Sequence, residues 1–123
     1  MADAVEACAA HDLGRLDRRD EVLAAVTALQ KVAPEAAFDA LLCTGHTNEA
    51  VAALVAMLSD PATRAHAIQI AQLYDDPLDP ASDLLDMRYR LRALAASDAV
   101  QEALKPYGRT VPLPFLSSAA GVY

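Results

Sequence analysis

Apolar residues recur along the chain at the three- and four-residue spacing of helices with one buried face, and strand-type alternation is nearly absent. Caps and helix breakers divide this pattern into segments. The segments predict seven helices: residues 3 to about 12, from Asp17 or Asp20 to about 32, 34–43, from Thr47 to about 58, from Asp60-Pro61 to about 73, from Pro80 or Ser82 to about 94, and from Ser97-Asp98 to near Pro106 and Gly108. We therefore expect an all-α fold, either an irregular bundle or a short stack of helical hairpins with six or seven helices and an extended C-terminal tail.

Glycine, proline and short polar residues set the predicted helix ends. Gly14 and Gly45 follow apolar segments in the position of a helix C-cap, and Pro34 suits a first helical turn. Asp17 or Asp20 is expected to cap the second helix. Four further residues are predicted to open helices as caps or as residues of the first turn: Thr47, Asp60, Pro61 and Ser97.

Three predicted helices show a clear apolar stripe. In the second, we expect the buried face to contain Val22, Leu23, Val26, Leu29 and Val32. In the fifth, we expect it to contain Ala65, Ile68 and Leu73, with Ala71 and Gln72 beside it. In the sixth, the stripe consists of Leu84, Met87, Leu91 and Leu94.

Residues 50–67 resemble one hairpin of the HEAT repeat family, with an apolar helix that leads into Asp60-Pro61. A looser copy precedes it, since Val22 corresponds to Val51 and Pro34 to Pro61. The resemblance covers the fourth and fifth predicted helices, about two dozen residues in all. The two copies are offset by 29 residues at Val51 and by 27 at Pro61, which is shorter than the roughly 40–47 residues of a repeat in that family. We interpret it as packing of a helical hairpin, which would imply a binding scaffold but does not fix a function.

The last residues differ from the rest of the chain, because Pro112 and Pro114 exclude a continuous helix. We predict a helical domain over residues 1–108 and an extended apolar tail over residues 109–123. The tail packs either on the body of the protein or on a partner. The tail residues expected to contact a partner are Val111, Leu113, Phe115, Leu116 and Tyr123.

Charge and apolar run length narrow the range of partners. The formal net charge of the 123-residue chain is −7, which argues against binding to the phosphates of nucleic acid. The longest apolar run, residues 50–58, is shorter than the roughly 18–20 residues that span a membrane. The acidic start, Met1 to Glu6, lacks the basic residues of a signal peptide. We therefore expect a cytoplasmic protein that binds neither nucleic acid nor membranes.

The most specific motif is a repeated Cys-x-x-His spacing, in Cys8 with His11 and in Cys43 with His46. Two thiolates and two imidazoles form the ligand set of a structural zinc site, and residues three apart share one face of a helix. The alternatives are ordinary buried thiols beside solvated histidines, or a Cys8–Cys43 disulfide if the chain is exported. We therefore expect no cofactor, with a bound zinc ion as the alternative.

Basic residues gather in the sixth predicted helix, at Arg88, Arg90 and Arg92. Because the leucine stripe of that helix faces inward, these side chains are expected on its outer face. Arg88 and Arg92 are candidates for partner binding, since guanidinium groups bind carboxylates with two hydrogen bonds. The alternative is pairing within the chain, for example with Asp83 or Asp86. A similar, smaller group consists of Arg15, Arg18 and Arg19.

The chain contains no phosphate-binding loop, dinucleotide fingerprint, metalloprotease motif or nucleophile elbow. The sequence therefore favours a non-enzymatic protein–protein interaction module, such as an accessory subunit, adaptor or assembly factor, that binds another protein or a second copy of itself. The alternative is a small metalloprotein with a Cys2His2 zinc site. A third hypothesis, a small-molecule binder, depends on alanines leaving a pocket between helices.

Overall fold

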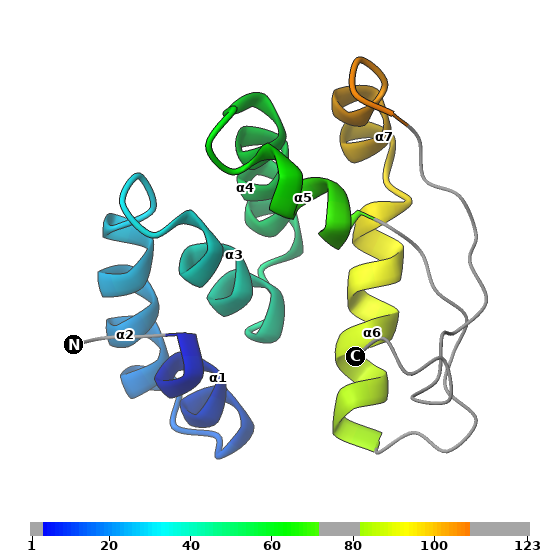
Figure 1. Cartoon of the computed structure of the whole chain (residues 1–123). Coiled ribbons are helices and arrows are strands. Elements are labelled where there is room, and N and C mark those ends of the chain that lie inside the picture. Colours follow the sequence, from blue (N-terminus) through cyan, green and yellow to red (C-terminus); the bar gives the residue numbers. More distant parts are fainter. Residues whose placement is uncertain (1–3, 72–81, 109–123) are drawn as a thin grey trace, which may run out of the picture. The chain divides into compact units, whose positions relative to one another are not determined.

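The computed structural model describes residues 4–71 and 82–108, with side chains for residues 4–71 and 89–108. All regular elements in these ranges are helices, which confirms the prediction of an all-α protein (Figure 1). In chain order they are α1 (Ala4–Asp12), α2 (Leu16–Ala28), α3 (Pro34–Cys43), α4 (Thr47–Ser59), α5 (Arg64–Ile70), α6 (Ser82–Ala95) and α7 (Asp98–Leu104).

The chain divides into two compact units, residues 1–57 and residues 58–123. In the first unit, α1 packs against α2 and α3, and α2 packs against α3 (Figure 1). In the second unit, α6 contacts α7. The tail predicted from residue 109 lies outside the described residues and stays a prediction.

The core of the first unit is built around α3, which is buried along most of its length. Its largest buried side chain is Phe38, and burying a side chain of this size stabilises a fold by about 1.5–3 kcal/mol. The neighbouring helices contribute smaller groups. The other buried residues of α1 to α3 are Ala7, Ala10, Val22, Leu23, Val26, Ala37, Ala40, Leu41, Leu42 and Cys43.

Gly14 ends α1 through a left-handed backbone conformation, with φ of 72°. The Gly14 amide donates a hydrogen bond to the His11 carbonyl at 3.1 Å, and the Arg15 amide donates one to the Ala10 carbonyl at 2.9 Å. These are the two hydrogen bonds of a Schellman motif, in which glycine is favoured because it has no Cβ. The predicted end of the first helix is confirmed.

Gly45 ends α3 in the same way, with φ of 80°. The Gly45 amide donates to the Leu42 carbonyl at 3.3 Å, and the His46 amide donates to the Leu41 carbonyl at 2.9 Å. Each Cys-x-x-His pair therefore lies at or near a helix end that closes with the same turn.

The predicted cap of α2 is wrong. The helix begins at Leu16, with Arg15 in the cap position and no side-chain hydrogen bond to the first amides. Asp17 lies in the first turn, where its negative charge still interacts favourably with the helix dipole. The turn at Gly14 carries the chain directly into the helix, so Asp17 and Asp20 fall inside it.

The predicted apolar face of α2 is correct up to Val26 and wrong beyond it. The helix ends at Ala28, so the three- to four-residue spacing no longer points the following side chains inward. As a result Leu29 is 47% exposed and Val32 is 83% exposed.

The start of α5 also differs from the prediction, because Asp60 and Pro61 form a turn before the helix. The Asp60 side chain accepts a hydrogen bond from the Ala62 amide at 3.0 Å, and α5 begins at Arg64. The predicted buried face of α5 is wrong at Ala65, which is exposed, while Ile68 is half-buried. The buried residues are Ala67 and Ala71, and Gln72 and Leu73 lie outside the described residues. In α6, Leu94 of the predicted stripe is buried and Leu91 is half-buried, whereas the side chains of Leu84 and Met87 lie outside the described residues.

Arg64 joins several parts of the second unit. Its Nε donates to the Leu58 carbonyl at 2.9 Å and its Nη2 to the Ser59 carbonyl at 3.4 Å. The guanidinium also lies 3.9 Å from the centre of the Tyr107 ring. The guanidinium group of Arg64 therefore donates hydrogen bonds to carbonyls at the C-terminal end of α4, where a positive charge is favourable. It also makes a cation–π contact with Tyr107, which follows α7.

We predict that Gly45→Ala lowers the free energy of unfolding by about 1 kcal/mol, because a Cβ disfavours the left-handed conformation. No heavy atom lies near the site a Cβ would occupy, so the cost comes from backbone strain and not from a clash. Urea denaturation checks this. The matched control, Gly45→Asn, should lose less, since asparagine tolerates this conformation. Equal losses for the two variants would contradict the explanation.

Candidate functional site

Cys8 and Cys43, predicted as zinc ligands, are joined in a disulfide that connects α1 to the last turn of α3. Their Cα atoms are 5.5 Å apart, a usual separation for this bond, and 35 residues separate them in the sequence. No free cysteine is present, because these are the two cysteines of the chain. The structure therefore adopts the disulfide alternative, with Cys43 buried and Cys8 half-buried.

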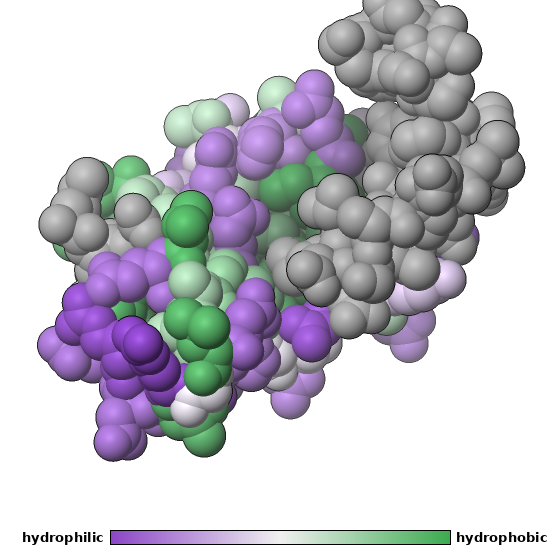
Figure 2. Space-filling model, turned by 90° about the horizontal axis from the view of Figure 1, so that it is seen from below, coloured by the Kyte–Doolittle hydropathy of each residue, from purple (hydrophilic) through white to green (hydrophobic). Residues whose placement is uncertain are grey.

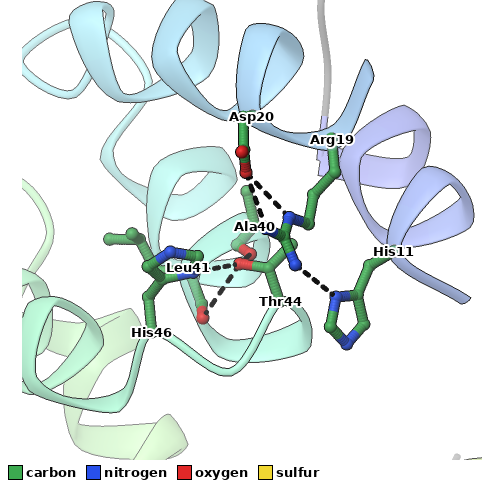
Figure 3. Close-up of polar contacts among 7 residues, drawn as sticks. All are labelled: His11, Arg19, Asp20, Ala40, Leu41, Thr44 and His46. Carbon is green, nitrogen blue, oxygen red and sulfur yellow. Dashed lines mark hydrogen bonds and ion pairs between the residues drawn. The ribbon is translucent and has the colours of Figure 1, made fainter. Parts of the chain in front are cut away.

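His11 follows Cys8 by one helical turn, but its ring contacts an arginine. Its Nδ1 lies 3.4 Å from Nη1 of Arg19, whose Nε donates to Asp20 at 2.8 Å (Figure 3). Because a guanidinium has no acceptor, His11 Nδ1 must accept this contact.

The hydroxyl group of Thr44 contacts the ring of the other histidine, His46. This hydroxyl donates to the Ala40 carbonyl at 2.7 Å and lies 2.8 Å from Nδ1 of His46 (Figure 3). A hydroxyl has one proton, so with that proton on Ala40 the His46 Nδ1–H must be the donor. Thr44 is buried, and these contacts satisfy its polar group.

The described geometry does not assemble the predicted zinc ligands Cys8, His11, Cys43 and His46. The two sulfurs are bonded to each other, and the described residues contain no group of three His, Cys, Asp or Glu that could hold an ion. Arg19 also places a positive charge beside His11, which would oppose a cation. Only the reduced chain could offer zinc its thiolates, and for that form the zinc site stays a prediction.

The N-terminal arginine group is used largely within the chain. Arg18 forms an ion pair with Glu6 of α1 and another with Glu21 at 3.1 Å. The hydrogen bond and the charge of Glu6 raise the pKa of Arg18, and the charge of Glu21 adds to this. Because a raised pKa keeps Arg18 charged, the stabilisation that its positive charge gives to the ion pair is fully present below the ordinary pKa of arginine. It is lost only in strong alkali. Since both partners are solvent-exposed, the pair adds little stability.

The second arginine group is only partly described. Arg90 is exposed and Arg92 is half-buried, and both have interactions within the chain. The Arg88 side chain lies outside the described residues, as do the predicted tail contacts Val111, Leu113, Phe115, Leu116 and Tyr123. Next to Arg90, Tyr89 is 51% exposed.

The outer face of α1 is apolar, a feature that the sequence analysis did not identify. Val5 is 76% exposed, Ala9 is exposed and Leu13 is 67% exposed, at a spacing of four residues. Val5 and Ala9 lie on one side of α1, and Leu13, which directly follows the helix and donates its amide to the Ala9 carbonyl at 3.0 Å, continues that side. We call these three residues the outer row. The left-hand part of Figure 2, in the region of α1 and α2, shows hydrophobic surface bordered by polar surface.

Thr44 and Arg19 are the other residues that sequence reasoning did not single out. For Thr44 the sequence does carry a signal. A threonine at a helix end, just before a C-cap glycine, can donate its hydroxyl to the backbone carbonyl four residues earlier. Nothing in the spacing of Arg19 distinguishes it from Arg15 and Arg18, because its role depends on the packing of α1 against α2.

Comparison with protein families, with curated proteins and with solved structures finds no match to this chain. Among the described residues, no helix has the length and apolar character that crossing a bilayer requires.

We predict that the protein purified without reductant is lighter than its sequence mass by two hydrogen atoms and resists alkylation by iodoacetamide. After reduction it should take up two acetamide groups, one on Cys8 and one on Cys43. Intact-mass spectrometry under denaturing conditions checks both statements. Rapid alkylation of the unreduced protein at both positions would show that the disulfide does not form.

We predict that Thr44→Val costs about 1–2 kcal/mol of unfolding free energy, because it leaves His46 Nδ1–H and the Ala40 carbonyl without this partner. Thr27→Val is a matched control. The Thr27 hydroxyl donates to the Leu23 carbonyl at 2.9 Å, four residues back, but no side-chain partner accompanies it. Thermal denaturation should show a clearly smaller loss for Thr27→Val, and equal losses would argue against the role of His46.

Proposed function

We propose that this protein is a non-enzymatic protein–protein interaction module, an accessory subunit or adaptor, which docks through the outer row of α1. The observation that carries the proposal is the exposure of Val5 and Leu13 on one helix face. Single exposed apolar residues are common, but an aligned apolar row rimmed by charged residues is typical of docking surfaces. Leu16, which follows the turn at Gly14, is also 50% exposed.

The composition of the surface around the outer row suits a protein partner. The chain is acidic overall, but Arg15 and Arg18 are exposed close to Leu13 and Leu16 in the sequence. An apolar centre with a charged rim is the usual arrangement at protein–protein interfaces. The net charge of −7 disfavours nucleic acid, whose binding depends on neutralising phosphates.

Two further surfaces support the proposal. Tyr89 and Arg90 are neighbouring exposed residues of α6, and tyrosine and arginine are enriched where binding energy concentrates at interfaces. The second is the apolar tail predicted over residues 109–123, since proline-containing segments bind partners with a reduced entropic cost.

The disulfide bears on where such a module would work. Disulfides persist in oxidising compartments, whereas most cytosolic disulfides are transient. We therefore propose two alternatives. Either the module functions in an oxidising compartment, or it functions in the cytoplasm, as expected from the sequence, and its disulfide forms and breaks there.

A photo-crosslinking residue tests the proposed function. We predict that p-benzoylphenylalanine in place of Ala9, in the cells that naturally make the protein, gives one discrete protein adduct on irradiation. The same residue in place of Phe115 tests the tail. The matched control replaces Ala99, which is exposed on α7 and far from the outer row in the sequence.

The mass of the adduct distinguishes the partners, since an adduct of twice the chain mass would identify a second copy of the protein. Val5→Ser together with Leu13→Ser should weaken the Ala9 adduct by tenfold or more if apolar docking drives binding, since each burial contributes about 1.5–3 kcal/mol. The absence of a discrete adduct at both Ala9 and Phe115 would contradict the proposal.

A further inference from the structure

The side chains on the inward face of α1 are small. Its buried residues are Ala7, at 0% exposure, and Ala10, at 5%. Alanine removes little apolar area from water, so these contacts contribute less than the leucine and phenylalanine side chains of α3. The larger apolar residues of the same stretch, Val5 and Leu13, point to solvent and do not anchor it.

The polar contacts of α1 with α2 are also weak. The Glu6–Arg18 ion pair is exposed on both sides, and such pairs contribute little to stability. The His11–Arg19 contact is long, at 3.4 Å. A helix of nine residues is in addition too short to be stable without tertiary support. Although α1 packs against both α2 and α3, the residues that it buries there are alanines, so these contacts remove little apolar area from water.

The disulfide supplies the missing anchor, since it fixes the middle of α1 to the end of α3. We infer that the Cys8–Cys43 bond is a redox latch: when oxidised it holds α1 against α2 and α3, and when reduced it lets α1 detach while α3 stays folded. The inference concerns the isolated protein and does not rest on the proposed function.

The reaction is thiol–disulfide exchange with a dithiol reductant. One thiolate of the reductant attacks Sγ of Cys8, the half-buried sulfur, and Cys43 Sγ leaves as a thiolate that takes up a proton. The second thiol of the reductant then displaces Cys8 Sγ from the mixed disulfide. Two electrons and two protons pass to the protein, and the reductant ends as a cyclic disulfide.

Reduction should leave the other helices of the unit in place, because their contacts do not depend on small residues alone. Val22, Leu23 and Val26 of α2 are buried, and so is Phe38 of α3. Detachment of α1 would uncover the surfaces of α2 and α3 that it covers, so the reduced protein should expose apolar surface that the oxidised protein hides.

Hydrogen exchange with mass spectrometry on the full chain tests the latch. Oxidised wild-type protein, the same protein in dithiothreitol, and protein reoxidised after removal of dithiothreitol are compared. We predict that the amides of residues 8–13 exchange at least about tenfold faster after reduction, that those of residues 38–43 change little, and that reoxidation restores the slow rate.

Two results would overturn the inference. Unchanged exchange in α1 would show that the helix does not need the bond, and equal acceleration across residues 4–57 would show that the bond supports the whole unit and is not a latch on α1. The double variant Cys8→Ser with Cys43→Ser should show the exchange rates of reduced wild-type protein, and dithiothreitol should not change them. Glu6→Gln in the oxidised chain is the control for the ion pair: if it releases α1 as much as reduction does, the disulfide is not the latch.

Discussion

The arrangement of the first unit depends on how closely α1 approaches α2 and α3. The inward side chains of α1 are Ala7 and Ala10, and small side chains let helix axes come nearer than leucines would allow. This close approach brings Cys8 of α1 within 5.5 Å of Cys43, measured between Cα atoms. The same small contact contributes little burial energy, so one constraint explains both why the disulfide can form and why α1 depends on it.

Much of the fold was predictable because local chemistry decides where these helices end. Gly14 and Gly45 adopt positive φ, which glycine tolerates best, so their effect was readable from the sequence. The start of α2 was not, because the tight turn at Gly14 leads straight into the helix and leaves Asp17 no cap position to occupy. Periodicity likewise predicted Val26 correctly but not Val32, since a helical pattern has meaning only up to the residue at which the helix stops.

The candidate site was only half predictable. The Cys-x-x-His spacing predicted a zinc site, and the Cys8–Cys43 disulfide was only its alternative for an exported chain, because the same thiols suit a zinc ion or a disulfide. The two histidines differ in this respect. The contact between His46 and the buried Thr44 is local, and the position of Thr44 just before a C-cap glycine is a signal in the sequence. The contact between His11 and Arg19 has no such signature, because it depends on how α1 packs against α2.

In α1, the usual relation between size and burial is reversed, since alanines face inward while Val5 and Leu13 face outward. Burial of the larger side chains would have stabilised the isolated unit more, by about 0.8 kcal/mol for each additional buried CH2. Larger inward residues, however, would push α1 away from α3 and separate the two cysteines. The inward positions of α1 are thus occupied by alanines, while Val5 and, just after the helix, Leu13 lie on the surface. The disulfide and the outer row are therefore two consequences of the same distribution of side-chain sizes, and a partner that covers the outer row would add the burial that α1 lacks.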